Sequence, residues 1–113
     1  MPSLPLEDVD DSTFAGRVLG SGTPVVVAHG ASWCAPCRQL EPVLEELAGH
    51  FAGRVRFVRV DTDAATVTPQ EQGIRGIPTV QLFRAGREVA RFQGARTKLE
   101  LLEAVDGLLG EPA

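Results

Sequence analysis

The feature that most constrains this chain is a pair of cysteines between a predicted strand and a predicted helix. Cys34 and Cys37 are the only two cysteines in the sequence. A β-branched run at 23–29, bounded by glycines, predicts a buried strand just before them. Behind them, apolar residues recur at helical spacing to about residue 52. The two thiols are therefore expected at the N-terminal end of a helix.

That position gives the pair a chemical character. The first backbone N–H groups of a helix lack intrahelical partners and the helix dipole is positive there, so a thiolate is favoured. The i, i+3 spacing brings both side chains to one helix face, close enough to form a disulfide. Pro36 suits an early helical position because its missing N–H would have no partner there. The pattern predicts one activated thiol and one resolving thiol.

Two other interpretations of the pair stay open at this point. In the first, the cysteines are an incidental pair of core thiols, because free Cys is among the most buried residue types. In the second, they form half of a zinc or iron–sulfur site shared between two chains, since such sites usually have four ligands. His29 and His50 lack the usual ligand spacing to the pair, so no metal site within the chain is predicted.

Length and charge favour one soluble domain spanning residues 1–113, with 1–9 loosely ordered or forming an edge strand. The formal net charge of −4 argues against nucleic acid or an anionic membrane as a main partner. No apolar run reaches the length of a signal peptide at the acidic N-terminus or of a membrane span elsewhere. We therefore expect a cytoplasmic protein, where a CxxC pair is more often catalytic or metal-binding than structural.

The remaining segments predict an α/β fold in the order (β)αβαβαββα. A short helix is expected within 10–19, a strand at 54–61, and a hairpin within 78–94 that turns at Ala85-Gly86. Strands separated by a helix imply a parallel crossover, whereas a hairpin adds antiparallel strands. We expect a mixed central sheet of four to five strands with helices on both faces.

Local signals also mark how the two longer helices begin, bend and pack. Thr97 followed by Glu100 is a capping box for the last helix. Pro42 should kink the helix after the cysteines, because proline removes a backbone donor and clashes with the preceding turn. The predicted apolar face of the last helix consists of Leu99, Leu102, Val105, Leu108 and Leu109.

A second motif, GIRGIPT at 73–79, places an Ile-Pro pair at the start of a predicted strand. Together with WCAPC at 33–37, Pro42 and the glycine of FQGA, it closely resembles the thioredoxin family. The resemblance keeps the family's order and spacing over 10–109. It implies the thioredoxin fold and a thiol–disulfide oxidoreductase that reduces protein disulfides by dithiol–disulfide exchange.

The resemblance also implies roles and partners. Cys34 would attack a client disulfide, and Cys37 would resolve the mixed disulfide; exposure of Cys34 at the helix end favours the same assignment. The partners would be disulfide-containing client proteins and a thioredoxin reductase that passes on electrons from NADPH. The chain itself should bind no cofactor and no metal, and we expect a monomer.

The substrate groove implied by the resemblance lies around the cysteines. The cis-proline of the family corresponds to Pro78, and the residue before it, Ile77, would offer backbone hydrogen bonds to an extended substrate peptide. A core position is the alternative for Trp33, although its neighbours in the sequence favour the rim of the site. The mostly apolar groove would be formed by Trp33, Ala35, Pro36, Gly76, Ile77, Pro78, Gly94 and Ala95.

The chain departs from the family pattern beneath the resolving cysteine. Ala28 stands where the family usually has a buried aspartate that exchanges a proton with this thiol. His29 and Gly30 replace a frequent Phe-Trp pair, and Arg59 replaces a usual lysine. His29 and Arg59 are therefore candidates for a proton route, although strand alternation should point His29 away from the face of Ala28. The missing Trp at position 30 should open space beside the cysteines.

Alternative functions stay open. One is a specialised thioredoxin-like redox partner with a narrow client, or a more oxidising isomerase or sensor. Another is a non-catalytic binding module with the thioredoxin fold. Ala35 stands between the cysteines where many thioredoxins have Gly, which is a mild change, so we expect a reducing protein.

Overall fold

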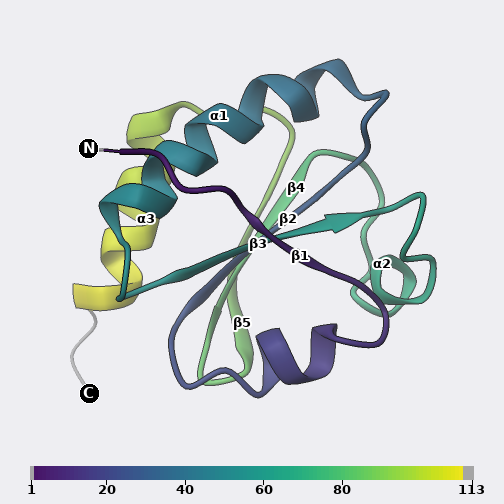
Figure 1. Cartoon of the computed structure of the whole chain (residues 1–113), viewed down its shortest axis with the longest axis horizontal. Coiled ribbons are helices and arrows are strands. Elements are labelled where there is room, and N and C mark those ends of the chain that lie inside the picture. Colours follow the sequence, from purple (N-terminus) through teal and green to yellow (C-terminus); the bar gives the residue numbers. More distant parts are fainter. Residues whose placement is uncertain (1, 111–113) are drawn as a thin grey trace.

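Five strands form one mixed sheet in the computed structural model, which describes residues 2–110 (Figure 1). The strands are β1 (Glu7–Val9), β2 (Val25–Gly30), β3 (Arg56–Asp61), β4 (Thr79–Arg84) and β5 (Arg87–Gln93). Their order across the sheet is β1-β3-β2-β4-β5. β3 is parallel to both β1 and β2, whereas β4 is antiparallel to both β2 and β5. The mixed sheet is confirmed, and β1 is an edge strand.

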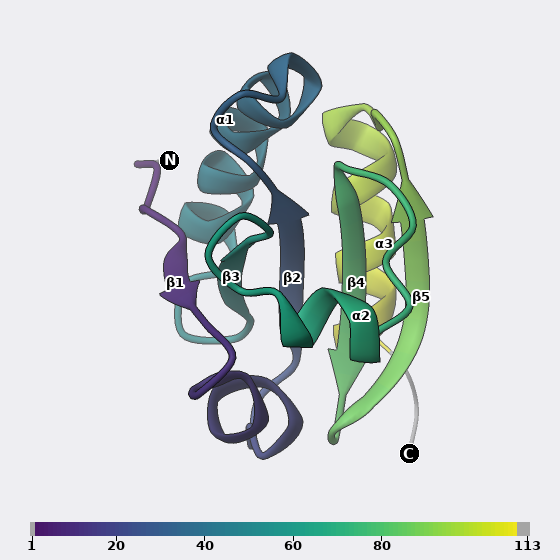
Figure 2. The ribbon, with the colours of Figure 1, turned by 90° about the vertical axis from the view of Figure 1, so that its right-hand side faces the viewer.

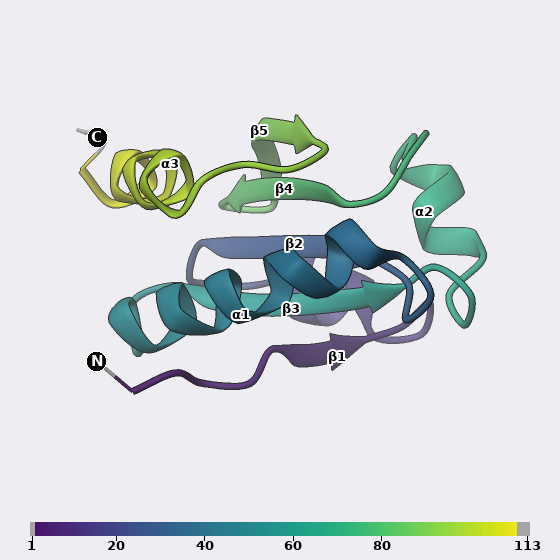
Figure 3. The same cartoon turned by 90° about the horizontal axis from the view of Figure 1, so that it is seen from above.

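Helices cover both faces of this sheet, as predicted. α1 (Ala35–His50) and α3 (Lys98–Gly110) pack on one face, and the short π-helical segment η1 (Ala15–Leu19) packs on the other (Figure 2). α2 (Val67–Glu71) precedes the loop that leads into β4. Seen from above, α1 runs beside β2 and β3, and α3 lies beside β4 and β5 (Figure 3). Pro42 lies inside α1, which continues past it, and the kink stays a prediction.

The central strand β2 is apolar on both faces because both faces are covered. Val25, Val26 and Val27 each expose at most 1% of their surface. Val26 belongs to the core beneath α1 and α3, whereas its two neighbours belong to the core beneath η1. Alternation along β2 therefore sends successive side chains into two separate cores and fixes the position of the strand end that precedes the cysteines.

Two local predictions are confirmed at the C-terminal end of the fold. Ala85 and Gly86 form the two-residue turn between β4 and β5, and both have the positive φ that such turns require, at 54° and 78°. The Thr97 N–H donates to the Glu100 side chain, and the Glu100 N–H donates to the Thr97 hydroxyl. This reciprocal pair is the predicted capping box of α3.

The predicted apolar face of α3 is wrong at one residue. Leu99 is 62% exposed, whereas Leu101, which the prediction left out, is 1% exposed and belongs to the core. The buried face runs through Leu101, Val105 and Leu108, which are separated by four and three residues. The other four predicted residues lie in this core or pack against it, so the prediction fails only in the first turn, where Leu99 points to solvent.

The ends of the predicted domain lie outside the described residues, namely residue 1 and residues 111–113. Within the part that the structure describes, no helix is long and apolar enough to cross a lipid bilayer.

Candidate redox site

The two cysteines lie where β2 leads into α1, as the sequence predicts. Cys34 is the N-cap residue of α1, and Cys37 lies in its first turn. A disulfide joins them, with the Cα atoms 5.2 Å apart. The Sγ atom of Cys34 accepts the backbone N–H of Cys37 at 3.3 Å, so this sulfur takes the place of a capping oxygen. The geometry favours Cys34 as the sulfur that carries negative charge when the disulfide opens.

The exposure of the two cysteines is the reverse of the sequence-based expectation. Cys34 is buried, with 6% of its surface exposed, whereas Cys37 is half-buried. Gly30 lies against Cys37, where an added Cβ would be 3.1 Å from its Sγ atom. Because a glycine stands there, no side chain at this position covers Cys37. The expectation that Cys34 is the more exposed thiol is therefore wrong for this oxidised state.

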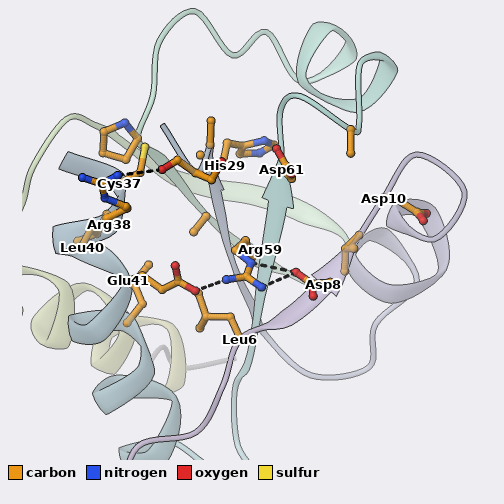
Figure 4. Close-up of a pocket in the computed structure, with 18 residues that line it drawn as sticks. Leu6, Asp8, Asp10, His29, Cys37, Arg38, Leu40, Glu41, Arg59 and Asp61 are labelled. Atoms are coloured by element: carbon orange, nitrogen blue, oxygen red, sulfur yellow. Dashed lines mark hydrogen bonds and ion pairs between the residues drawn. The ribbon is translucent and has the colours of Figure 1, made fainter. Parts of the chain in front are cut away.

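A cavity of about 610 Å³ reaches the pair from the side of Cys37 (Figure 4). We call it the Cys37 cavity. Its lining includes Ala28 and Gly30, the two positions where the chain departs from the family pattern, and Pro78. Of the two cysteines, it is Cys37 that lines it. The space expected beside the cysteines is thus present, and it lies next to Cys37.

Arg59 belongs to a small network of charges in the same cavity. Its guanidinium group pairs with Asp8 at 2.8 Å and with Glu41 (Figure 4). Glu41 lies one helical turn after Cys37 on α1, and both residues line the Cys37 cavity. A carboxylate is therefore present on the side of Cys37 although Ala28 supplies none. Sequence reasoning missed Glu41; the available signal was its i, i+4 spacing to Cys37.

His29 also lines the Cys37 cavity, but its hydrogen bond belongs to a different, buried network. It is 1% exposed, and its Nε2–H donates to the side-chain oxygen of Gln81 at 2.6 Å. The Gln81 amide in turn donates to Gln72 in the loop after α2. The Nδ1 atom of His29 has no hydrogen-bond partner among the described residues. These contacts favour the packed, hydrogen-bonded histidine over the role of a base for the cysteines.

We expect His29 to make the fold less stable as the pH falls below 6.5, its usual pKa. Burial lowers the pKa of His29, and the hydrogen bond to Gln81 opposes this shift only in part. The unfolded chain therefore binds the proton first, and the free energy of unfolding falls by about 1.4 kcal/mol per pH unit between the two pKa values. Urea unfolding at a series of pH values measures this slope.

The matched variants for this prediction are His29→Phe and His50→Phe. The first should remove the slope below about pH 6.5, and the second should retain it because His29 is still present. An equal slope in the wild type and in His29→Phe would contradict the prediction.

The structure places part of the predicted groove around the pair. Trp33 is 66% exposed, so it is not a core aromatic, and its indole N–H donates to Asp63 at 2.9 Å. The Ile77–Pro78 peptide bond is cis, as the resemblance implies. The N–H of Gly94 donates to the carbonyl oxygen of Pro78 at 2.8 Å and holds the two loops together. The other predicted groove residues, Ala35, Pro36, Gly76, Ile77 and Ala95, are at least partly exposed.

Within residues 2–110, no group of three or more His, Cys, Asp or Glu side chains is placed to hold a metal ion.

Comparison with known proteins agrees with this geometry. The sequence model of the Thioredoxin family matches residues 5–107. The chain is 38% identical to a chloroplastic M-type thioredoxin of Brassica napus, over 89% of this chain and 57% of that protein. It is 40% identical to thioredoxin 1 of Nostoc sp., over 87% of this chain and 92% of that protein. It is 42% identical to a thioredoxin of Acidithiobacillus ferridurans, over 89% of this chain and 94% of that protein. The chain thus spans little more than half of the plant relative.

Proposed function

The chain belongs to the thioredoxin family, and we propose that it reduces disulfides in client proteins by dithiol–disulfide exchange. The observation that carries the proposal is the Cys34–Cys37 disulfide at the N-terminus of α1. A disulfide between two residues of one helical turn closes a short ring, so its two thiols can open and close it without movement of the rest of the fold. We further propose that residues 1–113 form one thioredoxin-like domain.

In the proposed reaction the reduced chain acts first through Cys34. Its thiolate attacks one sulfur of the client disulfide, a mixed disulfide forms, and the other client sulfur leaves as a thiolate. The thiolate of Cys37 then attacks Cys34, the bond to the client breaks, and the second client thiol leaves. Two electrons pass to the client, and the chain ends with the disulfide seen in the structure.

The client would bind across this groove, most residues of which are at least partly exposed, whereas Pro78 is buried in the oxidised state. The backbone of Ile77 would pair with an extended client segment, as an added strand does. The flat indole of Trp33, which a hydrogen bond to Asp63 holds in place, would give an apolar contact that suits many unrelated sequences. The other groove residues in this proposal are Ala35, Pro36, Gly76, Pro78, Gly94 and Ala95.

The thiol of Cys37 must lose its proton before it can attack, and we assign the role of proton acceptor to Glu41. Arg59 acts as a positioning residue, because its ion pairs hold Glu41 beside the Cys37 cavity. Transfer would run through water in the cavity, which is large enough to hold several molecules. We assign the route to Glu41 rather than to His29, because the Nε2–H of His29 is engaged by Gln81 and burial favours the neutral ring.

Glu41→Gln should slow resolution of the mixed disulfide by about tenfold or more near neutral pH, since positioned proton acceptors contribute at least this much. Stopped-flow reduction of a client by the dithiol form measures the step, and its pH profile separates proton transfer from a loss of folding. Glu46→Gln is the matched control, because Glu46 lies on the same helix and pairs with Lys98 instead. Equal rates for both variants would remove Glu41 from the route.

Electrons would come from NADPH through a thioredoxin reductase, with no cofactor bound to the chain itself. We propose that the protein works as a monomer in the cytoplasm on disulfide-containing clients, without nucleic acid or membrane as a partner. A reductase-coupled assay with several unrelated protein disulfides tests the function. Turnover of all of them supports a general reductase, whereas turnover of one supports a partner with a narrow client. If the chain reduces none of these disulfides, the result would support the non-catalytic binding module instead.

A further inference from the structure

We propose that Cys37 is a second reaction site, at which a small uncharged or cationic thiol enters the Cys37 cavity and reduces the disulfide directly. The proposal rests on the redox-active disulfide of the proposed function and goes beyond it. It adds a reductant of a different chemical class, which reacts at the other sulfur of the pair and enters through the cavity rather than past Trp33; Pro78 borders both sites.

Access is the first argument. Cys37 is half-buried and lines a cavity of about 610 Å³, whereas Cys34 is 6% exposed. Gly30 makes this access possible, because a Cβ there would lie 3.1 Å from the Sγ and 3.2 Å from the Cβ of Cys37. Figure 4 places the Cys37 sulfur among the lining side chains on the side of α1. The volume suits a small molecule, since ligand cavities typically measure about 300–1,000 Å³.

The direction of bond breaking is the second argument. A thiolate that attacks the Sγ of Cys37 expels Cys34 as the leaving thiolate, and a thiol of lower pKa leaves faster. Cys34 is the better leaving group because its sulfur accepts the N–H of Cys37 at 3.3 Å and lies at the helix N-terminus. The cysteine that lines the cavity is therefore also the one at which attack releases the stabilised thiolate.

The reaction balances with two small thiols. The first attacks Cys37, the bond between the cysteines breaks, and a mixed disulfide forms on Cys37. A second small thiolate attacks the small-molecule sulfur of that mixed disulfide and releases Cys37 as a thiolate. Two small thiols are oxidised to one disulfide, and the protein disulfide takes up two electrons and two protons.

Charge defines the class of thiol. Carboxylates outnumber guanidinium groups by four to two among the lining residues. Arg59 is already paired with two of those carboxylates, Asp8 and Glu41. An anionic thiol would therefore meet a negative field in a confined space, whereas an uncharged or cationic thiol would not. The lining groups that carry these charges are Asp8, Asp10, Arg38, Glu41, Arg59 and Asp61.

The test uses the full chain with Cys34→Ser, in which Cys37 is the only thiol. Three small disulfides serve as probes: cystamine, which is cationic, bis(2-hydroxyethyl) disulfide, which is uncharged, and 3,3′-dithiodipropionate, which is anionic. Mass spectrometry follows the mixed disulfide on Cys37 with time. We expect the cationic and uncharged probes to react at least about tenfold faster than the anionic probe. Each rate is divided by the rate of the same probe with free 2-mercaptoethanol, which removes the differences in leaving-group pKa between the probes, and these normalised rates are the ones compared. Their ratio does not depend on the fraction of thiolate, so a changed pKa of Cys37 cannot produce it.

Closing the cavity provides the structural arm of the test. Gly30→Ala, added to Cys34→Ser, should lower the rate with every probe by about tenfold or more, because access limits exchange. Gly107→Ala is the matched control, since a Cβ at this position on α3 meets nothing within 4 Å. Ala28→Val, which narrows another part of the cavity, keeps the test valid if Gly30→Ala does not fold. Rates that are equal for all probes, or unchanged by the cavity-closing variants, would overturn the proposal.

Insulin reduction by the wild-type chain, from the same preparation, separates the two proposals. Suppose that the wild type reduces insulin, while the rate of mixed-disulfide formation on Cys37 depends neither on the charge of the probe nor on Gly30→Ala. The proposal of a second reaction site is then wrong, and the proposed function stands. If insulin is not reduced by the wild type, the proposed function itself fails, whatever Cys37 does.

Discussion

Cys34→Ser should abolish the reduction of insulin disulfides, with a rate at least about 10³-fold below that of the wild type. A serine hydroxyl cannot form the mixed disulfide, and its oxygen is hardly ionised near neutral pH. Dithiothreitol-driven precipitation of the insulin B chain measures the rate. Because Cys34 is the N-cap of an otherwise unchanged helix and Ser is a favourable N-cap residue, the variant should keep its fold.

Cys37→Ser is the informative companion. It should also lose turnover, but it should accumulate a mixed disulfide with insulin through Cys34, since nothing remains to resolve it. Peptide mapping of the trapped species identifies the sulfur that attacks the client. A trapped bond in the Cys34→Ser variant but not in Cys37→Ser would reverse the assigned roles.

Leu101→Ala should lower the free energy of unfolding by about 2–5 kcal/mol, the range for a buried leucine. Leu101 is 1% exposed and packs in the core beneath α1 and α3. A loss of that size is a large part of the roughly 5–15 kcal/mol that stabilises an ordinary domain. Urea unfolding monitored by circular dichroism measures the difference.

Leu99→Ala is the matched control for this change. Leu99 lies on the same helix and is 62% exposed, so the same substitution should change the free energy of unfolding by less than about 0.5 kcal/mol. Alanine and leucine have similar helix propensities, so the comparison isolates burial. Equal losses for the two variants would mean that α3 does not dock as the structure describes.

These two leucines also mark a limit of prediction from sequence. The capping residues of α3 act on their own backbone, so Thr97 and Glu100 could be read from a few neighbouring letters. The buried face of α3 could not be predicted in this way, because leucines surround much of the helix and their spacing allows more than one apolar stripe. Contact with the sheet selects Leu101 over Leu99, and that contact is tertiary.

The redox site likewise has features that the sequence predicts and features that it does not. The position of the cysteines between β2 and α1 follows from local patterns, since a β-branched run and a helical repeat adjoin them in the sequence. Their exposure depends on the distance from Gly30 to Cys37, which the sequence does not contain. The pairing of Arg59 with Glu41 likewise requires that α1 crosses β3 at one particular place. Properties set by the chain alone were predictable, and properties set by contacts between elements were not.

The reduction potential of the Cys34–Cys37 pair tests the central claim most directly. The pair would be equilibrated in dithiothreitol buffers of known potential, with the fluorescence of Trp33, the one tryptophan of the chain, as the signal. A reducing thiol–disulfide oxidoreductase requires a reversible two-electron titration at a potential below about −240 mV, in the region of the glutathione pool or lower. A potential well above this region, or the absence of any reversible titration, would contradict the account.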